Sequence, residues 1–285
     1  MLSPVTVDIG GAIDLHCHFG PDAHRQRSVT AIGAAVQARD AGHAGVLLKS
    51  HNEPTAQLAR VVAEVVDGID VFGGVCCDYE IGGLNPAAVE VALALGGRIV
   101  WLPTLSSRQD VANGVAAQLG IPGPGLAVLD DDGELLPEVR EIADLCREHD
   151  AVLATGHTTA AEHHAVARAY GRRQKVLVTH AMEELAGPNL SVEACAELAD
   201  LGATIELCAL TCIGALATRP VADLAGAARR IGVDRCTLAS DYGQAVNDPP
   251  AEGLQRFADS LADEGITSDE IRTMVVSNPA SLVAR

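Results

Sequence analysis

The chain has 285 residues and a mass of 29.4 kDa, which is enough to bury a substantial core. Apolar residues make up 48% and aromatic residues only 2%, so the core must be built from Ala, Val, Leu and Ile, and the composition excludes a disordered chain. The formal net charge of -18 repels a phosphate backbone or an anionic membrane, and few aromatic faces are present for bases to stack on. We therefore expect a small-molecule substrate, and neither nucleic acid nor a membrane as a partner.

Other sequence features indicate the cellular compartment. No window holds the roughly 18 uninterrupted apolar residues of a membrane helix, and the start MLSPVTVDIGG lacks the basic and apolar regions of a signal peptide. The eight cysteines stand mostly inside apolar runs and never form a C-x-x-C pair, so we interpret them as reduced, buried residues. These features predict a cytoplasmic protein.

Runs rich in Val, Ile and Leu alternate with Ala-rich stretches of helical spacing, and Gly, Pro or Asp stands at nearly every change. This alternation predicts repeated strand and helix units. Eight strands are expected, at 12–18, 44–51, 70–77, 98–104, 151–157, 175–180, 204–210 and 235–241. Helices are expected at 28–41, 54–67, 86–96, 137–149, 160–170, 191–201 and 220–231, with two more at 250–264 and 268–276.

Eight such units predict an α/β fold, a (β/α)8 TIM barrel, because that barrel typically takes about 250 residues. A doubly wound open sheet is the rival, but no Gly-rich phosphate loop follows the first strand. No linker marks a boundary, so residues 1–285 are expected to form a single barrel domain with an extra C-terminal helix. The loop insertion after the fourth strand, roughly 30 residues, is expected to lie over the C-terminal mouth, with a hairpin turn at Asp132-Gly133.

Ionisable residues close several predicted strands, at the end where barrels place their active sites. The first strand ends in His16-Cys17-His18, and because side chains alternate along a strand, the two imidazoles share a face and can reach one metal ion. Cys17 should then pack against the helices. Further ionisable strand ends, which would point toward the same mouth, are Lys49, His51, His157, His180 and Asp241.

These residue types suit a metal site. Imidazole and carboxylate are good ligands for Zn²⁺ and similar ions, and a catalytic site keeps one coordination position for water. A bound ion lowers the pKa of that water toward about 7 and polarises a carbonyl oxygen. Asp241 could both bind the ion and accept the proton of the attacking water. The strand ends together therefore predict a metal-dependent enzyme.

Several segments resemble the amidohydrolase superfamily, namely DLHCHFGPD, ATGH, LVTH, LASD and the closing SNPASLV. Members of that superfamily are (β/α)8 barrels with metal sites at the C-terminal mouth. More narrowly, LLKSHNEPT and GGLNPAAVE look like segments of a little-characterised amidohydrolase-like group. The resemblance implies that His16, His18 and Asp241 bind a metal. It also implies that His157 and His180 bind a second ion or contact the substrate.

One departure bears on the number of ions. Superfamily members with two metals usually bridge them with a carboxylated lysine or a glutamate on the fourth strand, and here that strand ends in WLPT with neither. The site is then either mononuclear or bridged from Lys49, Asp78 or Glu80. We expect one divalent ion, Zn²⁺ before Mn²⁺ or Fe²⁺, with Lys49 as a cationic or hydrogen-bonding group near a substrate oxygen. The residues expected to contact the substrate are His51, His157 and Arg25.

The leading hypothesis is a metal-dependent hydrolase in which a metal-bound hydroxide attacks the carbonyl of an amide, cyclic amide or ester. Asp241 would shuttle the proton, and His180 or His157 would help to stabilise the oxyanion, so Asp241, His180 and Lys49 are the catalytic candidates. Because DLHCH also resembles the opening of PHP-type phosphoesterases, such an enzyme is one alternative, although Asp241-Tyr242-Gly243 replaces their closing Asp-x-His. A metal-dependent decarboxylase and a catalytically silent binding barrel are the others.

Two further expectations concern residues away from these strand ends. Glu206, inside the seventh predicted strand, could line the barrel or form an ion pair below the mouth. The histidines in loop or helix positions are expected to be solvated, namely His24, His43, His149, His163 and His164. We also expect the barrel to associate as a homo-oligomer.

Overall fold

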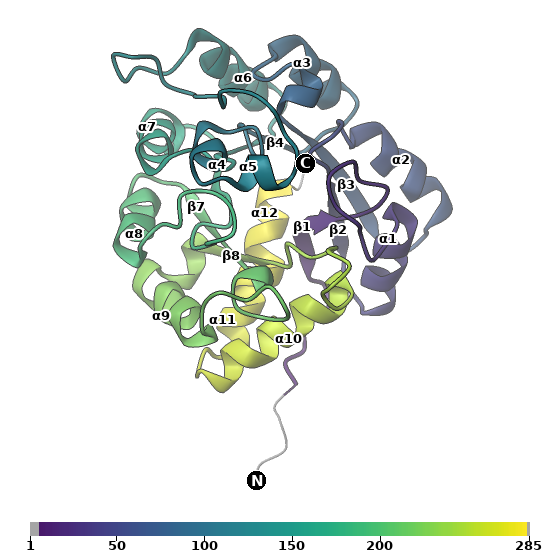
Figure 1. The fold of residues 1–285 in the computed structure, drawn as a ribbon. Coiled ribbons are helices and arrows are strands. Elements are labelled where there is room, and N and C mark those ends of the chain that lie inside the picture. The colour runs from purple at the N-terminus through teal and green to yellow at the C-terminus, as the bar shows by residue number, and fades with distance from the viewer. Residues whose placement is uncertain (1–5, 284–285) are drawn as a thin grey trace.

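The computed structural model describes residues 6–283, in which eight parallel strands follow one another around a sheet in the order β1 to β8. Backbone bonds of 2.8 Å from His18 N to Tyr242 O and from Asp241 N to His16 O join the first strand to the end of the last. Helices surround this nearly closed barrel (Figure 1), so the predicted (β/α)8 TIM barrel is confirmed. The strands are β1 (Ile13–His18), β2 (Gly45–Lys49), β3 (Asp70–Cys76), β4 (Ile99–Trp101), β5 (Val152–Ala154), β6 (Val176–Val178), β7 (Thr204–Cys208) and β8 (Cys236–Ala239).

The helices that the apolar periodicity predicted are all present. The last expected helix, at 268–276, is divided, because α11 passes into a π-helical turn before the chain ends in a further helix. The outer helices are α1 (Ala31–Asp40), α2 (Ala56–Val65), α3 (Pro86–Ala94), α6 (Pro137–Glu148), α7 (Ala160–Tyr170), α8 (Val192–Asp200) and α9 (Val221–Ile231). The C-terminal elements are α10 (Pro250–Asp263), α11 (Ser268–Arg272), η4 (Thr273–Ser277) and α12 (Asn278–Val283), and short 3-10 turns are η1 (Tyr79–Ile81), η2 (Ala209–Thr211) and η3 (Val233–Arg235).

The lower part of the barrel interior is apolar. Leu282 and Val283 of α12 pack against residues near the strand starts, among them Ile13 and Ile99. Helix α12 therefore covers the N-terminal end of the barrel, as the central yellow helix in Figure 1 indicates. Burial of these side chains stabilises the fold by about 25 cal/mol per Å² of apolar surface. Polar side chains inside the barrel are left to gather at the opposite, C-terminal end.

The long insertion after β4 forms one wall of that C-terminal end. It contains two short helices that the sequence did not reveal, α4 (Arg108–Ala112) and α5 (Val115–Gln118), and the predicted hairpin turn, where Gly133 N donates to Asp130 O. Buried Glu162 of α7 holds the insertion in place. Its Oε1 accepts the backbone N–H of Val128 at 2.9 Å and the Arg108 guanidinium at 3.1 Å. The insertion is thus tied to the barrel by a buried carboxylate.

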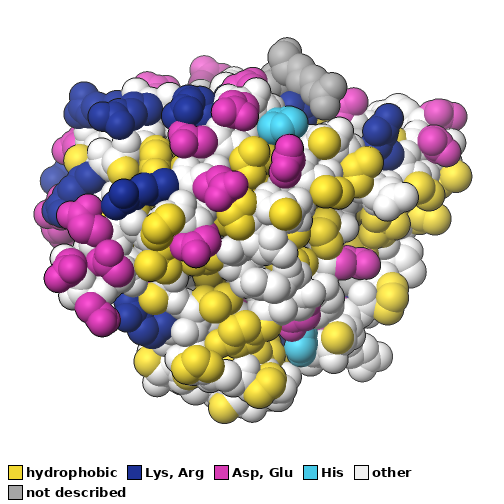
Figure 2. Space-filling model, turned by 90° about the horizontal axis from the view of Figure 1, so that it is seen from above, with side chains coloured by type: hydrophobic (Ala, Val, Ile, Leu, Met, Phe, Trp, Pro, Cys, Tyr) yellow, Lys and Arg dark blue, Asp and Glu magenta, His cyan; other side chains and the backbone are white. Residues whose placement is uncertain are grey.

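The outer surface is mixed in charge. On the face shown in Figure 2, acidic side chains are scattered among basic and apolar ones, and the basic side chains gather toward the left edge.

Within residues 6–283, the helices are all too short or too polar to cross a membrane.

Two histidines that were expected to be solvated are buried, so that prediction is wrong for His43 and His163. His163 lies on the inner side of α7, and its Nδ1 is 2.9 Å from Thr158 Oγ1 and 3.1 Å from Thr159 O. These hydrogen bonds make its burial tolerable. Burial lowers the pKa of His163 to about 3 and that of His43 to about 4, because the charged form loses its hydration.

His163 should make the protein less stable in acid. Its folded-state pKa lies below the unfolded value of 6.5, so its full contribution is present above pH 6.5 and is lost as the pH falls toward 3, where only the unfolded chain takes up the proton. Between pH 6.5 and pH 5 this linkage lowers the free energy of unfolding by about 2 kcal/mol. Urea unfolding at both pH values should show a smaller loss in His163→Asn than in wild type. His164→Asn, on the same helix, is the control, and equal losses in all three proteins would refute the assignment.

Candidate metal centre

Five histidine side chains meet at the C-terminal mouth of the barrel. The ring centroids of His16 and His18 are 5.2 Å apart, and those of His18 and His51 are 5.0 Å apart. The centroid distances between the next neighbours are 5.9 Å from His51 to His157, 4.5 Å from His157 to His180, and 5.7 Å from His180 to His16. All five residues are buried. Imidazoles predicted separately at four strand ends therefore form one closed ring.

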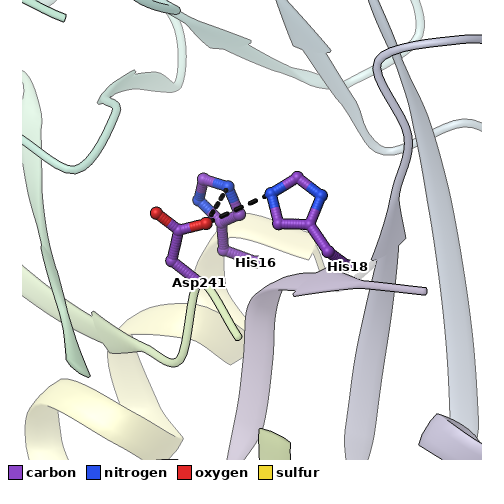
Figure 3. A group of neighbouring side chains, drawn as sticks. All are labelled: His16, His18 and Asp241. Atoms are coloured by element: carbon purple, nitrogen blue, oxygen red, sulfur yellow. Dashed lines mark ion pairs between the residues drawn. The ribbon is translucent and has the colours of Figure 1, made fainter. Parts of the chain in front are cut away.

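Asp241 joins this ring from the end of β8 (Figure 3). Its Oδ1 lies 3.2 Å from His16 Nε2 and 3.1 Å from His18 Nε2. The ligand atoms of these three residues lie within 4.8 Å of one another, which is close enough to share one ion. Asp241 has a φ of 52° and His180 a φ of 24°, so two residues of the site hold the left-handed backbone conformation that side chains rarely adopt.

A buried carboxylate fixes the orientation of the His16 ring. Glu206 Oε2 lies 3.0 Å from His16 Nδ1 and also accepts the backbone N–H of His180 at 2.9 Å. Burial raises the pKa of Glu206 to about 7, while the His180 N–H and the charge of Lys49 act in the opposite direction. Glu206 therefore lies below the mouth, as expected, but its contact with His16 is a hydrogen bond and not the expected ion pair, because burial keeps the imidazole neutral.

The His16 ring also provides the test of whether a metal fits. With Glu206 as acceptor, neutral His16 carries its proton on Nδ1, and Nε2 is a lone pair. That Nε2 is buried, has no hydrogen-bond partner among residues 6–283, and faces Asp241 Oδ1 at 3.2 Å. Two acceptors this close repel each other unless a proton or a metal cation lies between them. The donor set of two imidazoles and a carboxylate fits a divalent cation such as Zn²⁺.

A second carboxylate orients His157 in the same way. Asp110 Oδ2 lies 2.6 Å from His157 Nδ1, and Asp110 Oδ1 accepts the backbone N–H of Gly187 at 2.8 Å. His157 Nε2 then accepts from His180 Nε2 at 2.8 Å, which leaves His180 Nδ1 buried without a partner. Sequence reasoning missed Asp110, because it lies on the five-residue helix α4 of the insertion, where no periodicity or motif marks it.

His51 is oriented through a hydroxyl group. Its Nδ1 lies 2.7 Å from Thr104 Oγ1, and the Thr104 hydroxyl donates to Asp78. His51 therefore carries its proton on Nδ1 and presents Nε2 as an acceptor. Asp78 also accepts the backbone N–H groups of Thr104 and Ser106, so its oxygens are engaged away from the His16 ring. Glu80, the other acidic bridge considered, pairs with His24 at 3.0 Å.

Lys49 ends β2 as a side chain that is only 1% exposed. Its Nζ has no hydrogen-bond partner within residues 6–283, and no carboxylate oxygen of that range lies within 4.0 Å of it. The Lys49 Nζ lies over the ring of Trp101, whose centroid is 5.4 Å away. An ammonium group is thus buried beside the histidine ring with no counter-ion against it.

Burial sets the charge state of the ring. It lowers the pKa of four imidazoles well below 6.5, so they are neutral and their lone pairs are available to a metal. It also raises the pKa of Asp241 well above 3.8, against the opposing charge of Lys49. A cation at this carboxylate would favour its ionised form. The four imidazoles are those of His16, His18, His51 and His180.

A pocket opens onto the ring of histidines. His16 lies beneath it, fully buried, and Cys17 faces the opposite way, into the cluster formed with α1, as expected. Leu105 and Val115 of the insertion form part of the wall, as predicted for a loop over the mouth. The other predicted site residues all line this pocket, namely His18, Arg25, Lys49, His51, His157, His180 and Asp241.

Solved structures with the same fold include several hydrolases. An amidohydrolase from Pseudomonas aeruginosa matches with a TM-score of 0.60 and 12% identity over 95% of both chains. The dipeptidase AC, a metallopeptidase, matches with 0.60 and 15% over 99% of both chains. An amidohydrolase from Burkholderia multivorans with bound zinc matches with 0.57 and 15%, over 96% of this chain and 99% of that one. At such identities the likeness establishes the fold alone, a (β/α)8 barrel that this chain shares with these hydrolases.

Sequence comparison places the chain more narrowly. No curated protein matches it. A family model matches residues 11–206, a stretch that carries the His16 and His18 pair, Lys49, Asp110 and the histidines that follow β5 and β6. The chain therefore belongs to the family described as a family of unknown function, DUF6282.

Proposed function

We propose that this protein is a metal-dependent hydrolase that cleaves an amide, cyclic amide or ester bond in a small molecule. One divalent cation, Zn²⁺ before Mn²⁺ or Fe²⁺, is held by His16, His18 and Asp241. The observation that carries the proposal is the buried His16 Nε2, which faces Asp241 Oδ1 at 3.2 Å and has no hydrogen-bond partner within residues 6–283. The hydrolase structures that share this fold support the reaction class.

The residues around the cation divide the chemistry between them. The cation would supply Lewis acidity, lowering the pKa of water and polarising a carbonyl oxygen. Asp241 takes the proton from the attacking water on its carboxylate and returns it to the leaving group. The His180 Nε2–H, which bonds His157 Nε2 at 2.8 Å in the free protein, would turn to the carbonyl oxygen of a bound substrate and stabilise the negative charge that develops there. On the β2 side of the pocket, Lys49 donates to another oxygen of the substrate, and His51 Nε2 accepts a hydrogen bond from a substrate N–H or O–H group.

Gly243 speaks against the phosphoesterase alternative. It stands where the closing Asp-x-His motif of PHP-type enzymes requires histidine. A Cβ at this position would collide with the backbone carbonyl of His18, and the φ of 132° further disfavours a side chain. No histidine can therefore take that place while β1 and the segment after β8 keep their present contact.

Metal analysis tests the proposal directly. Protein purified without a metal-affinity tag should contain about one equivalent of Zn, Mn or Fe by inductively coupled plasma mass spectrometry, and His16→Ala should lose it. His164→Ala, a histidine on the outside of α7, is the matched control and should keep the metal. The metal-containing protein is then screened against amides, cyclic amides and esters. Protein that binds no metal even after reconstitution would refute the hydrolase and favour a silent barrel.

A further inference from the structure

The pocket is positively charged although the protein is acidic. Three basic side chains line it, Lys49, Arg25 and Arg27, against two acidic ones, Asp241 and Glu183. A divalent cation at Asp241 would leave a net positive charge there, in a chain whose overall net charge is -18. Such a local field concentrates anions of small size and guides them into the site.

Arg27 and Glu183 already have partners, the Arg25 side chain is exposed, and Lys49 is buried without a partner among the described residues. The Arg27 guanidinium binds Asp22 at 2.6 Å, and both oxygens of Glu183 accept hydrogen bonds, from the backbone beyond it and from Thr211. Lys49 Nζ makes no hydrogen bond within residues 6–283. Leaving a buried ammonium without an acceptor is costly, so a ligand anion at this point would both satisfy and neutralise it.

The rest of the pocket wall is apolar. Leu105, Val115 and Leu119 come from the insertion after β4, and Leu210 and Leu216 come from the connection after β7. A ligand that fills the space between these walls must carry an apolar body as well as the charged group. Within residues 6–283, Lys49 is the one buried cationic donor of the pocket wall that lacks a partner, which suits the single charge of a carboxylate better than a phosphate with its two charges and additional acceptors.

We infer that the substrate is a carboxylate with an apolar body, whose carboxylate group binds Lys49 Nζ while the bond to be cleaved lies at the metal centre. This inference rests on the proposed function for the position of the cleaved bond. Lys49 Nζ would donate to an oxygen of the substrate's carboxylate group. This contact also makes Lys49 a determinant of specificity, because a neutral analogue of the substrate leaves the ammonium buried and unpaired.

Isothermal titration calorimetry of the metal-loaded protein compares 3-phenylpropionate with its neutral amide and with 2-phenylethylphosphonate. Wild type should bind the carboxylate at least tenfold more tightly than the amide. Lys49→Met keeps the length of the aliphatic stem and should lose at least tenfold of that preference. The chain has one other lysine, Lys175, which pairs with Asp150 at 3.0 Å far from the pocket, and Lys175→Met should behave as wild type.

The presence of only two lysines allows a second measurement that needs no folded Lys49 variant. In wild type labelled with ¹³C and ¹⁵N lysine, the Nζ and Cε resonances of one lysine should shift on titration with 3-phenylpropionate, and Lys175→Met identifies the other. Equal binding of acid and amide, tighter binding of the phosphonate, or unchanged lysine resonances while the acid binds would overturn the inference.

Repeating the titrations after metal removal separates this inference from the hydrolase itself. Preference for the carboxylate that survives chelation and is lost in Lys49→Met supports the role of Lys49, whatever the metal analysis shows. Preference that needs the metal and persists in Lys49→Met overturns it, while the hydrolase proposal stands. A protein that contains no metal refutes the hydrolase independently of either result.

Discussion

The Asp241→Asn variant is expected to lose turnover by about a thousandfold while it keeps its fold and much of its metal. An asparagine amide cannot accept the proton of the attacking water, yet its oxygen can still face the ion. Asparagine also tolerates the left-handed backbone conformation at this position, where φ is 52°. The substitution therefore removes the proton acceptor with little change in backbone energy.

The measurement is kcat at saturating metal on the substrate found by screening, with metal content and near-ultraviolet circular dichroism recorded on the same samples. Asp131→Asn, in the exposed tip of the 130–133 turn, is the control for replacing a carboxylate elsewhere and should retain full turnover. An Asp241→Asn variant that holds its metal and turns over within a few-fold of wild type would remove Asp241 from the proton transfer.

The strand ends could be predicted from the sequence because they depend on two regular features. Alternation along β1 places His16 and His18 on one face, and the parallel order of the barrel brings the ends of β5, β6 and β8 to the same mouth. Neither feature depends on loops. The order of the strands is therefore enough to bring the imidazoles together at one end of the barrel. Side-chain packing then determines the distances between them.

The groups that orient those imidazoles could not be predicted, because they depend on the path of the insertion. Asp110 reaches His157 from 47 positions earlier in the chain, through a helix of five residues. Thr104 and Asp78 meet His51 from two different connections. Glu206 was visible as an unusual charge in an apolar strand, but its partner His16 is set by the closure of the barrel between β8 and β1.

The prediction of solvated helical histidines failed at His163 for a related reason. Its position in α7 does not by itself say which face is buried, because the helix is rich in alanine and its apolar stripe is weakly marked. The hydroxyl of Thr158, in the turn before the helix, then provides the hydrogen bond that lets an imidazole replace an apolar side chain there.

The two carboxylates that orient ring histidines offer a way to count the ions. Glu206 holds His16, a ligand of the proposed ion, whereas Asp110 holds His157, on the far side of the ring. Replacing the partner that orients a metal-bound histidine weakens metal binding by about 10 to 100-fold. Glu206→Gln is therefore expected to raise the Kd for Zn²⁺ by that factor, since the amide keeps the hydrogen bond and loses the charge.

Asp110→Asn is the matched comparison, since it makes the same chemical change at a carboxylate of equal burial. With one ion at His16, His18 and Asp241, the Kd of this variant for Zn²⁺, measured by competition with a chromophoric chelator, stays within about twofold of wild type. If His157 and His180 held a second ion, wild type would bind two equivalents and Asp110→Asn would release one of them. Equal weakening by both substitutions at a stoichiometry of one would instead make His157 a ligand of the same ion. The single-ion arrangement therefore requires two results together. Wild type must bind one equivalent of Zn²⁺, and Glu206→Gln must weaken Zn²⁺ binding while Asp110→Asn does not.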